Sequence, residues 1–113
     1  MALAYIGDSV YELYVRGHYL FPAKRIHDYH RQVVETVRAE RQAHYLEDYL
    51  LSRLTEEELD VVRRGRNASP RPSRKMSAKI YQQSTSFEAL LGYLYLTNPD
   101  RLWSLLELLP IGL

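Results

Sequence analysis

Residues 87–96, FEALLGYLYL, decide how this sequence is expected to fold. Glu88 is the only charged residue in this stretch, and its apolar residues occupy every side of the helix that the spacing predicts. A helix that is apolar on nearly every side is a buried helix. Gly92 follows Glu88 by one turn, and a glycine there lets another backbone come close. We therefore expect a buried helix that carries a single acid.

Residues 4–13, AYIGDSVYEL, repeat this pattern near the start of the chain. On a helical wheel Asp8 shares its face with Ala4, Tyr11 and Val15, and the opposite face is also apolar. A narrow polar strip interrupts the apolar surface, formed by Ser9, Glu12 and Arg16. We expect this helix to be buried as well, again with one acid.

The remaining apolar spacing indicates helix almost throughout, because no run alternates apolar and polar residues as a half-buried strand does. Thr55 and Glu58 form a capping-box sequence that should start a helix. The expected helices cover residues 2–20, 24–54 with one break, 55–64, 78–83, 86–96 and 98–109, with a loop at 65–77. The sequence predicts a single all-α domain over residues 1–113.

Composition excludes several classes of site. The 113 residues include no cysteine, so disulfides, thiolate nucleophiles and cysteine zinc sites are ruled out, and a reducing cytoplasm is the expected location. No stretch approaches the roughly 20 apolar residues that a membrane helix needs, so no membrane partner is expected. The first eight residues contain no basic residue, so no signal peptide is expected.

The two acids need compensation, since a carboxylate on a buried helix is costly when it stands alone. Asp8 or Glu88 could pair with a cation such as Arg16, could be protonated, or could bind a metal ion. Oxygen ligands without cysteine favour a hard cation, Mg²⁺ or Mn²⁺. The helix pattern alone leaves these three possibilities open.

The two acidic stretches, residues 4–13 and 87–96, resemble the motif helices of the ribonuclease III family. Residues 11–16 and 64–68 are similar to its Mini-III branch, which lacks a separate double-stranded-RNA-binding domain. The resemblance implies an all-α ribonuclease III-like endonuclease domain that forms a two-fold homodimer and cleaves double-stranded RNA. It also implies that Asp8 and Glu88 are the catalytic residues and the metal ligands, with Mg²⁺ as cofactor and Mn²⁺ as a substitute.

This sequence departs from most of the family at some acidic positions. Ala4 stands one turn before Asp8, and Thr85 stands where other members have an aspartate. The Mini-III branch shares this smaller number of acidic residues. Family members also usually have a further segment before the residue that is first here. For the branch, the resemblance implies maturation of the ends of large-subunit (23S) ribosomal RNA precursor, with a ribosomal protein as a possible presenter of the RNA. A non-catalytic RNA-binding module on the same fold, and a helical scaffold, are the alternatives.

Basic residues gather in one part of the chain, and residues 63–79 contain no acid. Concentrated cations without helical periodicity are typical of a phosphate-backbone contact, although a solvated loop is the alternative. The predicted RNA-binding residues are Arg63, Arg64, Arg66, Asn67, Arg71, Arg74 and Lys75.

We expect three other polar residues to contribute less to the site or not at all. Glu12 follows Asp8 by one turn and either joins the acidic site or pairs with Arg16 four residues on. His27 and His30 have a spacing that could suit a metal, but we interpret them as surface residues.

Overall fold

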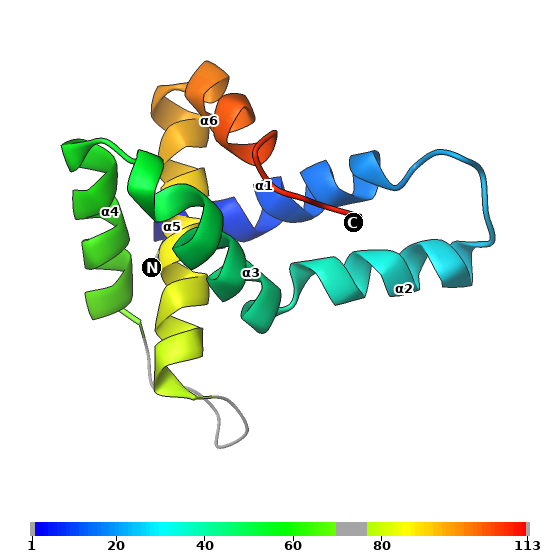
Figure 1. Cartoon of the computed structure of the whole chain (residues 1–113), viewed down its shortest axis with the longest axis horizontal. Helices are drawn as coiled ribbons and strands as arrows, with labels where there is room; N and C mark the ends of the chain where they lie inside the picture. Colours follow the sequence, from blue (N-terminus) through cyan, green and yellow to red (C-terminus); the bar gives the residue numbers. More distant parts are fainter. Residues whose placement is uncertain (1, 70–76, 113) are drawn as a thin grey trace.

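The computed structural model describes residues 2–69 and 77–112, which form helices and turns with no strand in those ranges. The elements are α1 (Ala2–His18), α2 (Ile26–Val37), α3 (Ala39–Tyr45), a π-helical turn η1 (Leu46–Leu50), a 3-10 turn η2 (Leu51–Arg53), α4 (Glu56–Asn67), α5 (Ala78–Thr97) and α6 (Pro99–Leu106). In Figure 1, α5 runs through the middle of the molecule, and α1 and α2 extend from it as an antiparallel pair. The all-α prediction is confirmed.

Helix α5 is the centre of the core. Its Phe87, Leu90 and Leu91 side chains are fully buried. Tyr11 of α1 packs edge-on against Phe87, with 4.9 Å between the ring centroids, and its hydroxyl donates to the Thr36 carbonyl at the end of α2. The other elements therefore pack around one central helix, as the apolar pattern of residues 87–96 predicts.

Two glycines let the backbones of α1 and α5 touch where they cross. A Cβ atom on Gly7 would lie 1.7 Å from the Glu88 carbonyl oxygen, and a Cβ on Gly92 would lie 2.0 Å from the Leu3 carbonyl oxygen. No side chain fits into such a gap, so both positions require glycine. The close approach expected at Gly92 is confirmed, and Gly7 is its partner on α1.

The prediction that α1 is buried on nearly every side is wrong. The helix buries one face against α5 and exposes the other, where Tyr5 is 79% and Leu13 is 73% accessible. The helical wheel showed apolar residues all round, but within the described part of the chain only one face of α1 packs against other elements.

Residues 78–97 form one continuous helix instead of a short helix followed by a strong one. The polar residues in its middle are accommodated by local bonds. The Ser84 and Thr85 hydroxyls donate to the Tyr81 carbonyl, and the Ser86 hydroxyl donates to the Val62 carbonyl of α4. Because these hydroxyls are satisfied within the fold, the segment expected to interrupt the helix remains helical.

Helix α4 begins with the predicted capping box between Thr55 and Glu58, in which each side chain accepts from the other residue's backbone N–H. It continues to Asn67, three residues beyond the predicted end. A Cβ on Gly65 would lie 3.0 Å from the Ala89 Cβ, so the glycine lies against α5. This packing outweighs the helix-breaking tendency on which the prediction relied.

We expect Gly7→Ala to destabilise the fold by about 3 kcal/mol or more, because a methyl group there overlaps the α5 backbone. Thermal or urea unfolding measures the change. Gly17→Ala is the matched control on the same helix, because no neighbouring atom lies within 4 Å of its added Cβ. Helix propensity should make that variant neutral or up to about 1 kcal/mol more stable. Equal losses in both variants would contradict the close crossing.

Candidate functional site

The glycine crossing brings the two predicted acids together. Gly7 contacts the backbone of Glu88, and Asp8 is the next residue on α1. Asp8 lies close enough to raise the pKa of Glu88 through a hydrogen bond and a charge interaction, although the two residues are 80 positions apart in the sequence. Asp8 is exposed and Glu88 is partly buried, so the pair opens to the surface and is not sealed in the core.

The pair holds a proton at neutral pH. Burial raises the pKa of Glu88 to about 8, and its hydrogen bond and charge interaction with Asp8 add to the rise. A hydrogen bond from the side chain of Gln42 opposes it. The protonated Glu88 carboxyl therefore donates to Asp8, and the repulsion between two close carboxylates is relieved by one proton.

Ion pairing was one of the three compensations that the sequence left open, and it is wrong for the described residues. Arg16 lies 3.7 Å from the Glu12 carboxylate, four residues before it on the same helix. Within residues 2–69 and 77–112 no salt bridge reaches Asp8 or Glu88. Glu12 therefore takes the second of its two predicted roles, as the partner of Arg16.

The donor chemistry of the pair fits a hard divalent cation. Both side chains offer carboxylate oxygens, and the side-chain oxygen of buried Gln42 has no hydrogen-bond partner. A divalent cation could replace the shared proton and balance both charges. In the described part of the chain no group of three His, Cys, Asp or Glu side chains could hold a metal, so most coordination positions would fall to water and phosphate oxygens.

The two positions that lack an acid are used for packing. Ala4 packs with Val61 of α4 and Ala89 of α5 in a small apolar cluster. Thr85 is buried, and its hydroxyl donates to the Tyr81 carbonyl at 3.0 Å. His27 and His30 are exposed on α2, in agreement with their interpretation as surface residues.

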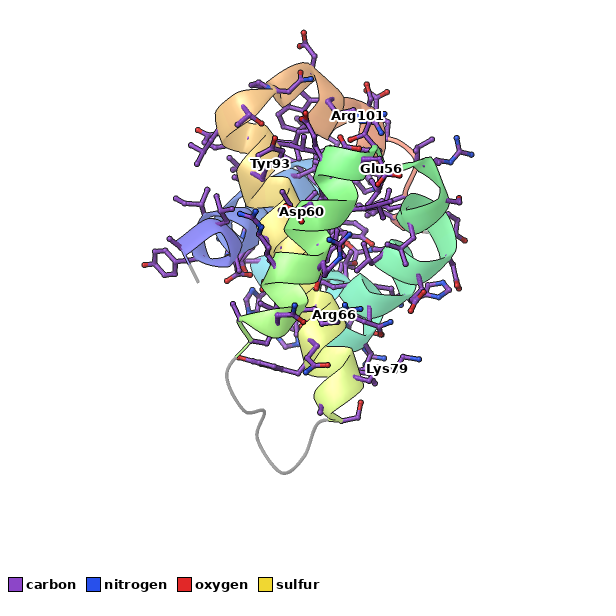
Figure 2. The ribbon with its side chains drawn as sticks, turned by 90° about the vertical axis from the view of Figure 1, so that its left-hand side faces the viewer. Glu56, Asp60, Arg66, Lys79, Tyr93 and Arg101 are labelled. Atoms are coloured by element: carbon purple, nitrogen blue, oxygen red, sulfur yellow. The ribbon has the colours of Figure 1, made fainter. Side chains whose placement is uncertain are left out.

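Two of the basic residues flank the point where α4 contacts α5. Because Gly65 contacts Ala89, its neighbours Arg64 and Arg66 leave α4 at the level of Glu88 on α5. Figure 2 shows Arg66 and Lys79 at the same end of the molecule, where α4 ends and α5 begins.

The expectation that the basic residues lie on a loop needs correction. Four of the predicted RNA-binding residues lie on the last turn and a half of α4, namely Arg63, Arg64, Arg66 and Asn67. Arg63 and Arg64 both pair with Asp60, at 3.1 and 2.9 Å. The other three predicted residues, Arg71, Arg74 and Lys75, lie outside the described residues.

The fold agrees with the comparisons with known proteins. The Ribonuclease III domain family matches residues 1–99, so the chain belongs to the ribonuclease III family. A crystal structure of a Fusobacterium nucleatum protein superposes with a TM-score of 0.85 at 26% identity, covering 93% of this chain and 86% of that one.

Within the family, the chain is similar to Mini-ribonuclease 3. It is 56% identical to the Thermosynechococcus vestitus protein of that name over 96% of this chain and 71% of the relative. It is also 56% identical to the Synechococcus protein, over 97% and 79% of the two chains. The chain is therefore an endoribonuclease of the ribonuclease III class, in its Mini-ribonuclease 3 branch, as the resemblance of the two acidic stretches implied.

Sequence reasoning found the two acids but missed Gly7 and Gln42. Gly7 precedes the acid Asp8, and its pairing with Gly92 could have been suspected because both are small residues on helices that carry an acid. No sequence signal marks Gln42, which reaches Glu88 only through the packing of α3 against α5.

The raised pKa of Glu88 predicts how stability depends on pH. Between about pH 4.5 and about pH 8 the folded chain holds a proton on Glu88 that the unfolded chain has lost, so this group makes folding less favourable as pH rises. In EDTA, Glu88→Gln should melt at a similar temperature to the wild type near pH 4.5 and several degrees higher near pH 8. A difference in melting temperature that does not grow with pH would contradict the shared proton.

Proposed function

We propose that this protein is a Mg²⁺-dependent endonuclease that cleaves double-stranded RNA and leaves a 5′-phosphate and a 3′-hydroxyl. The observation that carries the proposal is the carboxyl pair of Asp8 and Glu88, which the glycine crossing joins in an otherwise apolar region. Membership of the ribonuclease III family supports the same reaction class.

The two acids have different tasks in this proposal. A bound Mg²⁺ or Mn²⁺ ion would supply Lewis acidity and a source of hydroxide for attack on phosphorus. Asp8, which is exposed, offers an oxygen that substrate and solvent can reach. Glu88 gives up its proton as it becomes a ligand, so cation binding should tighten as pH rises toward about 8. Both acids lie on helices that pack tightly, which keeps their oxygens in place.

The basic end of α4 is proposed to hold the RNA backbone beside the acids. Double-stranded RNA is recognised mainly by shape, through phosphates and 2′-hydroxyls. Arg63 and Arg64 face Asp60, which partly neutralises them, whereas Arg66 makes no salt bridge within the described residues. We therefore propose Arg66 as the principal contact among the described cations of this segment.

The substrate is proposed to be a structured precursor of large-subunit (23S) ribosomal RNA in the cytoplasm. This rests on the likeness to the Mini-III branch, whose members lack a double-stranded-RNA-binding domain. A partner that presents the RNA would add to the contacts made by the basic residues of α4, and a ribosomal protein is the proposed presenter. In the described ranges no helix is long and apolar enough to cross a bilayer.

Two chains are proposed to associate through the outer face of α1. That face exposes Tyr5 and Leu13, and it continues into a hollow of about 260 Å³. The hollow is lined by Ile6, Ser9, Val10, Leu13, Tyr95 and Trp103. Contiguous exposed apolar side chains of this kind mark an interaction surface. A two-fold dimer would bury this surface on both chains at once.

A non-catalytic RNA-binding module is the second candidate. One observation favours it, namely that no third acid joins Asp8 and Glu88 within the described residues. Such a protein would bind an RNA duplex and leave it intact with Mg²⁺ present.

Asp8→Asn keeps the shape of the side chain and removes its charge, so we expect it to lower the rate of duplex-RNA cleavage in Mg²⁺ by about 100-fold or more. Time courses on a long RNA duplex, with and without EDTA, measure the rate. Sedimentation equilibrium is the control, and it should give wild type and variant alike the mass of two 13.3 kDa chains. Wild-type cleavage by Asp8→Asn would refute the assignment of the site. A wild type that binds the duplex without cutting it would favour the second candidate.

Reversing the charge of Arg66 with Arg66→Glu should weaken duplex binding about tenfold and reduce its dependence on salt concentration, because a phosphate contact is lost. Filter binding at several salt concentrations measures both effects. Arg53→Glu makes the same change in net charge on η2 and serves as the control. The Arg53 carbonyl accepts from Arg101, which Figure 2 shows at the opposite end of the molecule from Arg66. Equal effects of the two variants would mean that net charge, and not the position of Arg66, governs binding.

A further inference from the structure

Gln42 is a buried polar residue that the proposed reaction has not yet used. It lies on α3, its side chain is only 3% exposed, and α3 packs against α5. A buried amide is costly unless both its donors and its acceptor find partners. The partners of Gln42 therefore indicate why a glutamine stands in this position.

The amide nitrogen of Gln42 can donate two hydrogen bonds. It donates to the Val37 carbonyl oxygen at 2.8 Å, which satisfies a backbone acceptor at the last residue of α2. The Gln42 side chain also acts on Glu88, because it lowers the pKa of that carboxyl through a hydrogen bond. An amide nitrogen carries two hydrogens, so one side chain can serve both acceptors. The bond to Val37 anchors the amide and so limits where Glu88 can lie.

The other end of the amide has no partner. The Gln42 Oε1 atom is buried and accepts no hydrogen bond from residues 2–69 or 77–112. An unpaired buried acceptor costs about 1–3 kcal/mol, so its retention calls for a reason. Capping α2 would explain the bond to Val37, but it explains neither the contact with Glu88 nor the unpaired oxygen. A water molecule in the hydration shell of a cation is a donor of the right kind for such an oxygen.

We propose that Gln42 is a positioning residue of the acid pair, which holds Glu88 toward the cation and accepts a hydrogen bond from a cation-bound water through Oε1. The role rests on the proposed function, because it assumes that Asp8 and Glu88 bind a divalent cation. Groups that orient a metal ligand commonly change metal affinity 10- to 100-fold when they are removed. Gln42 should therefore govern how tightly the cation binds more than how fast the bound complex reacts.

Gln42→Met tests this, because methionine is unbranched and of similar length but lacks both the donor and the acceptor. Mn²⁺ binding without RNA, followed by electron paramagnetic resonance, should weaken about tenfold or more. The Mg²⁺ concentration that half-saturates RNA cleavage should rise by a similar factor, and excess Mg²⁺ should restore the maximal rate. Thr36→Val is the control, since Thr36 is also buried and polar but bonds to Tyr19 and Gln32.

Unchanged Mn²⁺ affinity in Gln42→Met would overturn the inference and leave the proposed function intact. A wild-type protein that neither binds Mn²⁺ nor cuts RNA would overturn both. Gln42→Glu gives a second test that does not depend on how well the methionine variant folds. It adds a negative charge beside the pair, so Mn²⁺ should raise its melting temperature more than that of the wild type. A rise no larger than in the wild type would show that Oε1 points away from the cation.

Discussion

At the crossing of α1 and α5 two backbones lie in direct contact, because Gly7 and Gly92 carry no side chain. This contact sets the register of one helix on the other. It places Asp8 beside Glu88, and on the same side of α5 it lets Ala4 pack with Ala89 and Val61 of α4. A larger residue at either glycine would move the helices apart and would separate the acids. The geometry of the candidate site thus follows from a packing constraint, not from an attraction between its charged groups.

The acid pair would repel if both carboxyl groups were ionised. Burial and the nearby Asp8 side chain raise the pKa of Glu88 to about 8. The packing of α1 on α5 supplies the stability that keeps the groups close. Without a ligand this arrangement lowers the stability of the fold, and a bound divalent cation would remove that cost. Such arrangements are typical of functional sites. The partly exposed position of the pair makes it reachable by a large substrate.

Much of the fold could be predicted from the sequence because helical periodicity and capping residues act locally. The Thr55 capping box and the start of the last helix at Asn98 both agree with the structure. The errors arose where tertiary contacts outweigh local preference. Residues 78–97 stay helical because Ser86 bonds to α4, and α4 passes through Gly65 because that glycine lies against α5. The outer face of α1 was predicted to be buried because a helical wheel does not show which face meets a neighbour.

The sequence by itself determined the helical class, the two acids and the glycine one turn after Glu88, since these depend only on residue type and spacing. It also determined the likeness to the ribonuclease III family. The tertiary structure alone decided that Asp8 and Gln42 both act on the pKa of Glu88, and that Arg16 pairs with Glu12 instead. The physical reason is distance along the chain: hydrogen bonds and charge interactions between residues far apart in sequence exist only once packing has brought their helices together.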